Sequence, residues 1–117
     1  MIDIIYIDDE PALLRAATLV LESCGLSLAT FERADEAIAF IRDHDVGLVF
    51  CDFRMPGMTG VEVLRAIEKE LPFFLISGDI QIQQELKDEP RLTGFLAKPL
   101  SFFDLAKLAK ETLGKRD

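Results

Sequence analysis

The stretch Ile4-Ile5-Tyr6-Ile7-Asp8-Asp9-Glu10-Pro11 places three acidic residues directly after a run of hydrophobic ones. The run starts at Ile2 and is rich in β-branched residues, which is typical of a central parallel strand that is covered on both faces. Pro11 suits the first turn of a helix, where its missing N–H is not needed. The stretch therefore predicts a strand and then a helix, with carboxylates at the carboxyl end of the strand.

Two later hydrophobic runs also end in a charged residue. Residues 48–51 lead into Asp52, and residues 95–97 lead into Lys98-Pro99. In an open parallel sheet, ligands bind at the carboxyl ends of the strands. We therefore expect three carboxylates and one ammonium group to gather at one edge of a small α/β domain.

Helical and strand patterns alternate along the whole chain. The expected strands cover residues 2–7, 26–31, 47–51, 73–76 and 93–97. The first expected helix begins at Pro11 and ends at Gly25, and the second carries an apolar stripe of Ala34, Ala37, Ile38 and Ile41. The third follows a capping box of Thr59 and Glu62 and presents Val63, Leu64, Ile67 and Leu71. Ser101 and Asp104 cap the last, whose stripe is Phe102, Leu105, Ala106, Ala109 and Leu113.

The segment 79–89 has the weakest pattern, and we expect a short or irregular helix there because Pro90 limits its extent. One hypothesis is that the longer stretch 79–93 is mobile and specific to the partner. Five βα units with right-handed crossovers make the expected fold an α/β, doubly wound parallel sheet.

Composition limits the classes of function. The chain has 117 residues, of which half are hydrophobic, so we expect one globular domain over residues 1–117. The net charge of −8 argues against direct binding to nucleic acid or to an anionic membrane. Without a signal peptide or an apolar run of spanning length, the sequence favours a soluble, cytoplasmic protein. Cys24 and Cys51 are expected to be free and buried, and Lys115 and Arg116 to be solvated terminal residues.

The expected cluster suits phosphoryl chemistry. Bare carboxylates of Asp8, Asp9 and Asp52 would repel one another, and Mg²⁺ removes that conflict by taking oxygen ligands. Lys98 and Ser77 offer contacts to phosphate oxygens, and Asp52 on the central strand is the expected nucleophile. Each group alone is more often a helix cap, a turn residue or a solvated charge. The prediction depends on all of them falling at the same edge.

The chain resembles a response-regulator receiver domain of bacterial two-component signalling, of the CheY-like superfamily, over essentially its whole length. The segments that carry the resemblance are Tyr6-Ile7-Asp8-Asp9-Glu10-Pro11, Asp52-Phe53-Arg54-Met55-Pro56-Gly57-Met58-Thr59-Gly60, Ile76-Ser77-Gly78 and Leu96-Ala97-Lys98-Pro99-Leu100. The resemblance implies a flavodoxin-like (βα)5 fold with strand order 2-1-3-4-5. It also implies that the protein is phosphorylated and acts as a switch or as a carrier in a phosphorelay.

The resemblance assigns roles to individual residues. It implies that Asp52 accepts a phosphoryl group from a sensor histidine kinase or a histidine phosphotransfer protein. It implies Mg²⁺ bound by Asp8, Asp9, Asp52 and the backbone carbonyl of Arg54, with Ser77 and Lys98 on the phosphoryl oxygens. The Lys98-Pro99 peptide is a candidate for the cis isomer.

The resemblance also places Phe95 at an aromatic switch position that acts together with Ser77. Phe95 lacks a phenolic hydroxyl, so an inward state would depend on packing alone. The alternative, that Phe95 is simply part of the core at an edge strand, stays open.

Two other functions are considered. A phosphorylation-independent binding module with the receiver fold would not need Asp8, Asp9, Asp52, Ser77 and Lys98. A phosphohydrolase of the haloacid dehalogenase type would have a second aspartate two residues after the nucleophile, where this chain has Arg54. We therefore expect no enzyme activity beyond slow loss of the domain's own phosphoryl group. The only histidine, His44, is expected to be a solvated loop residue.

Overall fold

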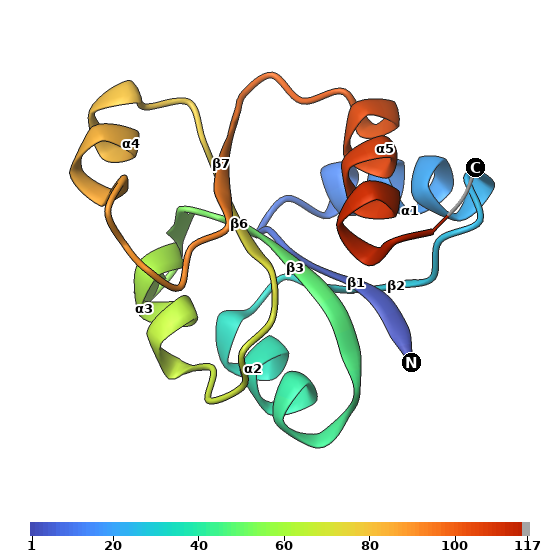
Figure 1. Ribbon diagram of the computed structural model, residues 1–117, viewed down its shortest axis with the longest axis horizontal. Helices are drawn as coiled ribbons and strands as arrows, with labels where there is room; N and C mark the ends of the chain where they lie inside the picture. Colours follow the sequence, from blue (N-terminus) through green and yellow to red (C-terminus); the bar gives the residue numbers. More distant parts are fainter. Residues whose placement is uncertain (116–117) are drawn as a thin grey trace.

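The computed structural model describes residues 1–115 and shows a parallel sheet between two layers of helices (Figure 1). Within these residues the sheet has five strands in the order β2-β1-β3-β6-β7. Their bounds are β1 Ile2–Ile7, β2 Leu28–Phe31, β3 Val46–Asp52, β6 Phe73–Ser77 and β7 Gly94–Ala97. The expected doubly wound, flavodoxin-like fold and its strand order are confirmed.

Helices cover both faces of the sheet. Their bounds are α1 Pro11–Ser23, α2 Ala34–Asp43, α3 Gly60–Ala66, α4 Ile80–Leu86 and α5 Phe102–Leu113. Helices α1 and α5 pack on one face, over Ile4, Tyr6, Leu48 and Phe50. Helices α2, α3 and α4 pack on the other, over Ile5, Ile7, Val49 and Cys51. Because β1 and β3 are buried on both faces, their sequences are hydrophobic runs rather than alternating patterns.

The expected helix ends agree with the structure in most places. Pro11 is the first residue of α1, and Thr59 and Glu62 form the expected capping box of α3. The side chain of Ser101 accepts the N–H of Asp104 at the start of α5. The expected short helix in segment 79–89 is α4, with Asp79 as its N-cap.

The expected extent of the third helix is wrong. Helix α3 ends at Ala66, so Leu71 lies outside it, although Leu71 still packs against the core. The chain turns at Ile67, and the guanidinium group of Arg91 donates to the carbonyls of Ile67 and Lys69. These bonds satisfy carbonyl groups that a longer helix would have used.

A short hairpin between β3 and α3 was not expected. Strands β4 (Arg54–Met55) and β5 (Met58–Thr59) pair in antiparallel fashion, and Gly57 has a φ of +81° in the turn. Gly60 begins α3 close to the end of the sheet. A Cβ atom there would lie 2.3 Å from Cδ2 of Leu75 and 3.1 Å from the carbonyl oxygen of Asp52.

The residue Lys115, just after α5, is attached to the amino end of β1, at the opposite end of the strand from Asp8. Nζ of Lys115 lies 3.0 Å from Oδ1 of buried Asp3, whose Oδ2 accepts the N–H of Ser27. Lys115 is exposed as expected but also makes this ion pair, and Arg116 lies outside the described residues. Burial opposes ionisation of Asp3, but its bonds to Ser27 and Lys115 prevail and lower its pKa.

Candidate functional site

The register of the sheet brings the predicted site residues together at one edge. Ile7 pairs with Cys51, so the residues that follow them, Asp8 and Asp52, are neighbours. Asp52 pairs with Ile76, which places Ser77 one residue further along. Ser77 pairs with Ala97, which places Lys98 one residue further again.

The three aspartates form one cluster. Each of Asp8, Asp9 and Asp52 offers a carboxylate oxygen, and these oxygens lie within 4.8 Å of one another. Asp8 and Asp52 are only 2% and 6% exposed, whereas Asp9 faces solvent. Since carboxylate oxygens are the ligands that hard divalent cations prefer, this cluster can hold a metal ion.

The electrostatics of Asp8 favour a cation. Burial raises the pKa of Asp8 to about 6, and the charges of Asp52 and Asp9 act in the same direction, although the N–H of Glu10 and the charge of Lys98 oppose them. Oδ1 of Asp8 accepts the Glu10 N–H at 3.0 Å. Oδ2 is buried and has no hydrogen-bond partner among residues 1–115. A buried, unpaired carboxylate oxygen beside two other carboxylates is what a metal ligand would look like before the ion binds.

Lys98 supplies the positive charge of the site. Its Nζ lies 2.9 Å from Oδ1 of Asp52, although Lys98 itself is exposed. Partial burial opposes the charge on Lys98, but the hydrogen bond that Lys98 donates to Asp52 and the charges of Asp52 and Asp8 prevail and raise the pKa of Lys98. The expected cis peptide is present between Lys98 and Pro99.

Ser77 lies beside Asp52 in a cavity of about 260 Å³. Its side chain is buried, and its Oγ accepts the backbone N–H of Asp79 at 3.0 Å. The other lining residues are Phe53, Arg54, Ile76, Gly78, Asp79 and Lys98. Asp52 also lines the cavity, which is large enough for a phosphoryl group.

The loop after Asp52 is held against the sheet. The N–H of Phe53 donates to the carbonyl of Ile76 at 2.9 Å, and the Phe53 carbonyl accepts the N–H of Gly60 at 2.7 Å. The next residue, Arg54, has an exposed side chain whose guanidinium lies 3.8 Å from Oδ2 of Asp79. Asp79 was not among the predicted site residues. The available signal was an acidic residue two positions after Ser77.

The remaining expectations concern residues further from Asp52. Phe95 is half-buried in β7 and packs against the core on the α2, α3 and α4 side. His44 is exposed as expected, and its ring stacks on Phe40 with centroids 3.9 Å apart. Both cysteines are free, with Cys51 buried and Cys24 partly exposed.

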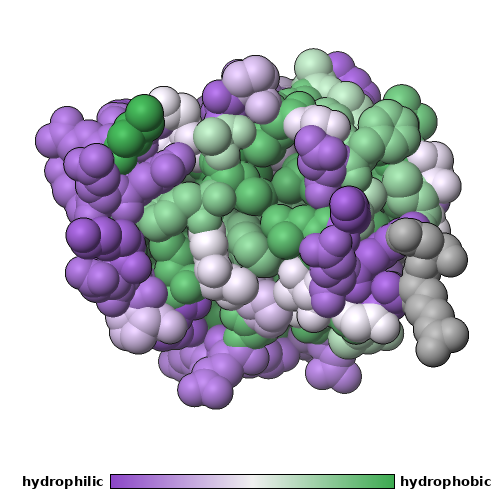
Figure 2. Space-filling model, turned by 45° about the horizontal axis from the view of Figure 1, so that its top comes forward, coloured by the Kyte–Doolittle hydropathy of each residue, from purple (hydrophilic) through white to green (hydrophobic). Residues whose placement is uncertain are grey.

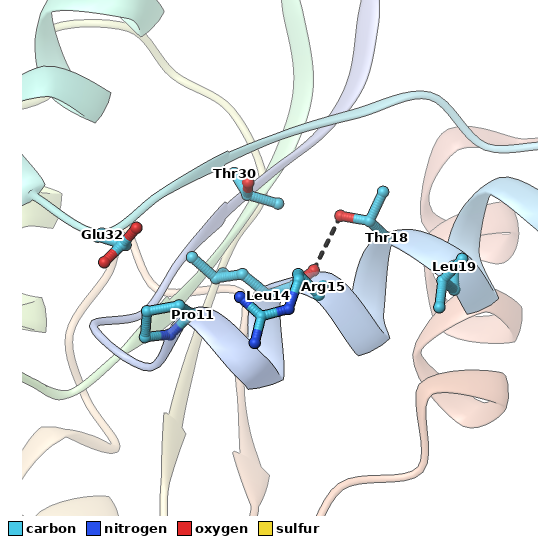
Figure 3. Close-up of a pocket in the computed structure, with 7 residues that line it drawn as sticks. All are labelled: Pro11, Leu14, Arg15, Thr18, Leu19, Thr30 and Glu32. Carbon is cyan, nitrogen blue, oxygen red and sulfur yellow. Dashed lines mark hydrogen bonds between the residues drawn. The ribbon is translucent and has the colours of Figure 1, made fainter.

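A second hollow, of about 400 Å³, lies between α1 and β2 (Figure 3). Its lining residues are Pro11, Leu14, Arg15, Thr18, Leu19, Thr30 and Glu32. Figure 3 shows these side chains on α1 and on the neighbouring segment of Thr30 and Glu32, with the Thr18 hydroxyl donating to the carbonyl of Leu14. None of the three clustered aspartates lines this hollow, so it is distinct from the acidic site.

Comparison with known proteins identifies the family. The family model described as "Response regulator receiver domain" matches residues 4–110, which contain all the clustered residues. The chain belongs to the response regulator receiver domains. As a receiver domain it is a phosphoryl acceptor rather than a catalyst, and the pocket of Asp8, Asp9 and Asp52 is typical of the phosphoacceptor site. The family also implies a cognate kinase, and it removes the alternative of a phosphohydrolase.

Individual relatives agree with this assignment. The receiver domain is 32% identical over 117 residues to the C4-dicarboxylate transport transcriptional regulatory protein DctD of Rhizobium meliloti, covering 97% of this chain and 25% of that protein. The chain thus spans about a quarter of the length of this relative. Among residues 1–115, no helix has the length and hydrophobicity needed to cross a membrane.

Solved structures are similar over nearly the whole receiver domain. The response regulator protein TrrA of Thermotoga maritima, in complex with Mg(2+)-BeF, has a TM-score of 0.84 and 26% identity, covering 97% of this chain and 100% of that one. The chemotaxis protein CheY4 of Vibrio cholerae has a TM-score of 0.84 and 25% identity, covering 97% and 99%. The TrrA structure shows that a receiver domain with this fold contains Mg²⁺.

Proposed function

We propose that Asp52 accepts a phosphoryl group from a phosphohistidine on a sensor histidine kinase or a histidine phosphotransfer protein. The observation that carries the proposal is the position of Asp52, which lies within 4.8 Å of the oxygens of Asp8 and Asp9 and 2.9 Å from Nζ of Lys98. A carboxylate between an acidic pair and a lysine can attack phosphorus while the charge on the phosphoryl oxygens is neutralised.

The transfer balances with the groups present. A carboxylate oxygen of Asp52 forms the new bond to phosphorus, and the P–N bond to the donor imidazole breaks. The electron pair goes to the imidazole nitrogen, which takes up a proton, and Asp52 becomes an acyl phosphate. Lys98 then pairs with a phosphoryl oxygen in place of the Asp52 carboxylate, and the Ser77 hydroxyl donates to another.

The cation that fits this site is Mg²⁺. Asp8, Asp9 and Asp52 would hold it, together with the backbone carbonyl of Arg54. When bound, the ion offsets the repulsion between the aspartates and the incoming phosphoryl group. The orphaned Oδ2 of Asp8 supports this proposal.

We further propose that residues 1–117 act as one receiver domain whose output goes through protein contacts. Ser77 and Phe95 would carry the change from Asp52 towards β7. Figure 2 shows hydrophobic residues gathered across the surface between α4 and α5. Ile80 on α4 and Phe103 on α5 are 70% and 66% exposed. A conformational change at β7 would reach a partner protein through this surface.

Intact mass after incubation with acetyl phosphate and Mg²⁺ tests the proposal. We expect one phosphoryl adduct on the parent and on the exposed-site control Asp88→Ala, and none on Asp52→Ala or without Mg²⁺. An adduct that survives in Asp52→Ala would show that another residue is the acceptor. If neither an adduct nor a beryllofluoride complex forms on the parent, the domain is a phosphorylation-independent binding module.

A further inference from the structure

Tyr6 is an unusual residue for its place in the fold. It is the only tyrosine of the chain, and it stands in β1 among isoleucines with 0% exposure. Its ring packs against Phe50 on β3, with centroids 5.9 Å apart, and against Phe102 at the start of α5, at 6.3 Å. An aliphatic side chain or phenylalanine would serve this packing without bringing a hydroxyl group into the core.

The hydroxyl group of Tyr6 has no hydrogen-bond partner among residues 1–115. A buried tyrosine hydroxyl normally finds one, because leaving it unpaired costs the hydration that it loses. Among the described residues, one other buried side-chain atom has no hydrogen-bond partner, and it is Oδ2 of Asp8. The Tyr6 hydroxyl is a donor, and the carboxylate oxygen of Asp8 is an acceptor.

The two side chains lie on the same side of the sheet. Tyr6 and Asp8 are two positions apart on one extended segment, so they project to the same face. Phe102 follows the loop that carries Lys98, so its contact with Tyr6 places the ring near the acidic edge. Burial and then the charges of Asp8 and Asp52 raise the pKa of Tyr6, which agrees with this position.

We infer that Tyr6 is a positioning residue of the metal site, whose hydroxyl donates a hydrogen bond to Oδ2 of Asp8 when the cation is bound. The inference rests on the proposed Mg²⁺ site. No hydrogen bond joins the two atoms in the structure described here, so the pair forms only if a side chain moves when the cation binds. Oδ1 of Asp8 is already fixed by the Glu10 N–H, and the Tyr6 bond fixes the second oxygen. Groups that orient metal ligands in this way affect metal affinity strongly.

The substitution Tyr6→Phe tests the inference because it removes one oxygen atom and keeps the ring. We expect the metal-free variant to be at least as stable as the parent and to bind Mg²⁺ about 10-fold more weakly in titration calorimetry. The control is Thr112→Val, which deletes a hydroxyl that donates to the Leu108 carbonyl on α5, away from the site. It should bind Mg²⁺ as the parent does.

Tyr6 also provides a direct measurement on the unmodified protein. The chain has no tryptophan, so the fluorescence excited in the tyrosine absorption band, where its phenylalanines do not absorb, comes from Tyr6 alone. A carboxylate that accepts a hydrogen bond from the phenol quenches this emission. We therefore expect Mg²⁺ to lower the emission with the same dissociation constant that calorimetry gives.

The outcomes separate the inference from the proposed function. Mg²⁺ binding to the parent together with equal affinity in Tyr6→Phe would overturn the role of Tyr6 and leave the metal site standing. Unchanged Tyr6 emission during calorimetric binding would overturn it as well. A parent that binds no Mg²⁺ would overturn both.

Discussion

Asp52 is the last residue of β3, and Lys98 directly follows β7. These strands are not neighbours, since β6 lies between them, yet the charged groups of the two residues are 2.9 Å apart. The lysine side chain crosses the end of β6 to reach the carboxylate. Among the described residues, the ammonium group of Lys98 is the only positive charge that forms an ion pair with Asp52. This ion pair therefore connects the edge strand of the sheet to Asp52, the proposed phosphoacceptor.

Replacement of Lys98 by alanine is expected to weaken both folding and phosphorylation. Without the ammonium group, Asp52 is left beside two other carboxylates, and because Lys98 is partly exposed we expect a loss of only about 1–2 kcal/mol in the free energy of unfolding. Urea unfolding without divalent cations measures this loss. Phosphorylation by acetyl phosphate should slow at least about 10-fold. The exposed-lysine control Lys107→Ala should change neither quantity, and unaltered labelling of Lys98→Ala would contradict the role of Lys98.

Stability without metal should fall as the pH rises through the range in which Asp8 ionises. The pKa of Asp8 is raised from 3.8 to about 6 in the folded protein. Between these values the folded state binds more protons than the unfolded state, so stability decreases from about pH 4 to pH 6 and stays lower above it. The gap corresponds to at most about 3 kcal/mol.

Asp8→Asn removes this pH dependence. The variant should be more stable than the parent at pH 7.5 by about 1–3 kcal/mol without divalent cations, with a smaller difference at pH 5. It should also lose the stabilisation that Mg²⁺ gives the parent. Denaturant unfolding at both pH values measures the effect, and an equal difference at pH 5 and 7.5 would refute the assignment of the dependence to Asp8.

Arg54 and Asp79 lie on two sides of the cavity above Asp52, with their charged groups 3.8 Å apart. Both side chains are substantially exposed, so the pair should contribute less than about 1 kcal/mol to stability. Removing the guanidinium in Arg54→Ala opens the mouth of the cavity to water. We expect the phosphoryl group on Asp52 to be lost a few times faster, measured by the decay of the adduct mass. Arg33→Ala, which removes a remote exposed pair with Asp35, is the control, and equal decay rates would remove this role.

The segment after α4 is held by Arg91, whose guanidinium donates to carbonyls at the end of α3. Arg91→Ala should leave these carbonyls without that donor and destabilise the domain by about 1–2 kcal/mol. Hydrogen exchange should speed up in residues 67–71 and 87–93.

If the parent already exchanges rapidly over Ile82 to Leu86, the hypothesis of a mobile, partner-specific segment is supported; slow exchange there would count against it.

Gly60 allows α3 to approach the sheet beside Asp52. Gly60→Ala would force its Cβ against Leu75 and the Asp52 carbonyl, with an expected cost of about 1–3 kcal/mol and weaker phosphorylation. Gly78→Ala is the matched control in the same site, because its Cβ would meet only the Cβ of Lys98 at 3.8 Å. Equal melting temperatures for the two variants would contradict this account.

The sequence predicts the sheet and the acidic edge well because both depend on local patterns. A hydrophobic run that ends in Asp8 or Asp52 predicts a strand and what lies at its end without knowledge of the rest of the fold. The early end of α3 could not be predicted in this way. The carbonyl groups that follow this end bond to Arg91, which lies 24 residues from Ile67 in the sequence.

The same limit applies within the site. The structure brings Asp8, Asp9, Asp52, Ser77 and Lys98 together at one edge, as expected, but their hydrogen bonds were not predicted. Whether Ser77 bonds to Asp79, or which carboxylate oxygen Lys98 contacts, depends on side-chain rotamers that no periodicity encodes. The orphaned hydroxyl of Tyr6 became visible only when its surroundings were known, although a phenol in an aliphatic strand was the available signal.

The site also depends on the alignment of four strands, in which Asp8, Asp52, Ser77 and Lys98 follow one another by the register of β1, β3, β6 and β7. A slip of one residue in any pair would turn the functional side chain of that strand to the opposite face of the sheet. A misaligned sheet could keep its helices and much of its core, but it could not form an acyl phosphate. The fraction of a preparation that becomes phosphorylated therefore measures how much of the protein has reached its native register, which circular dichroism and size do not report.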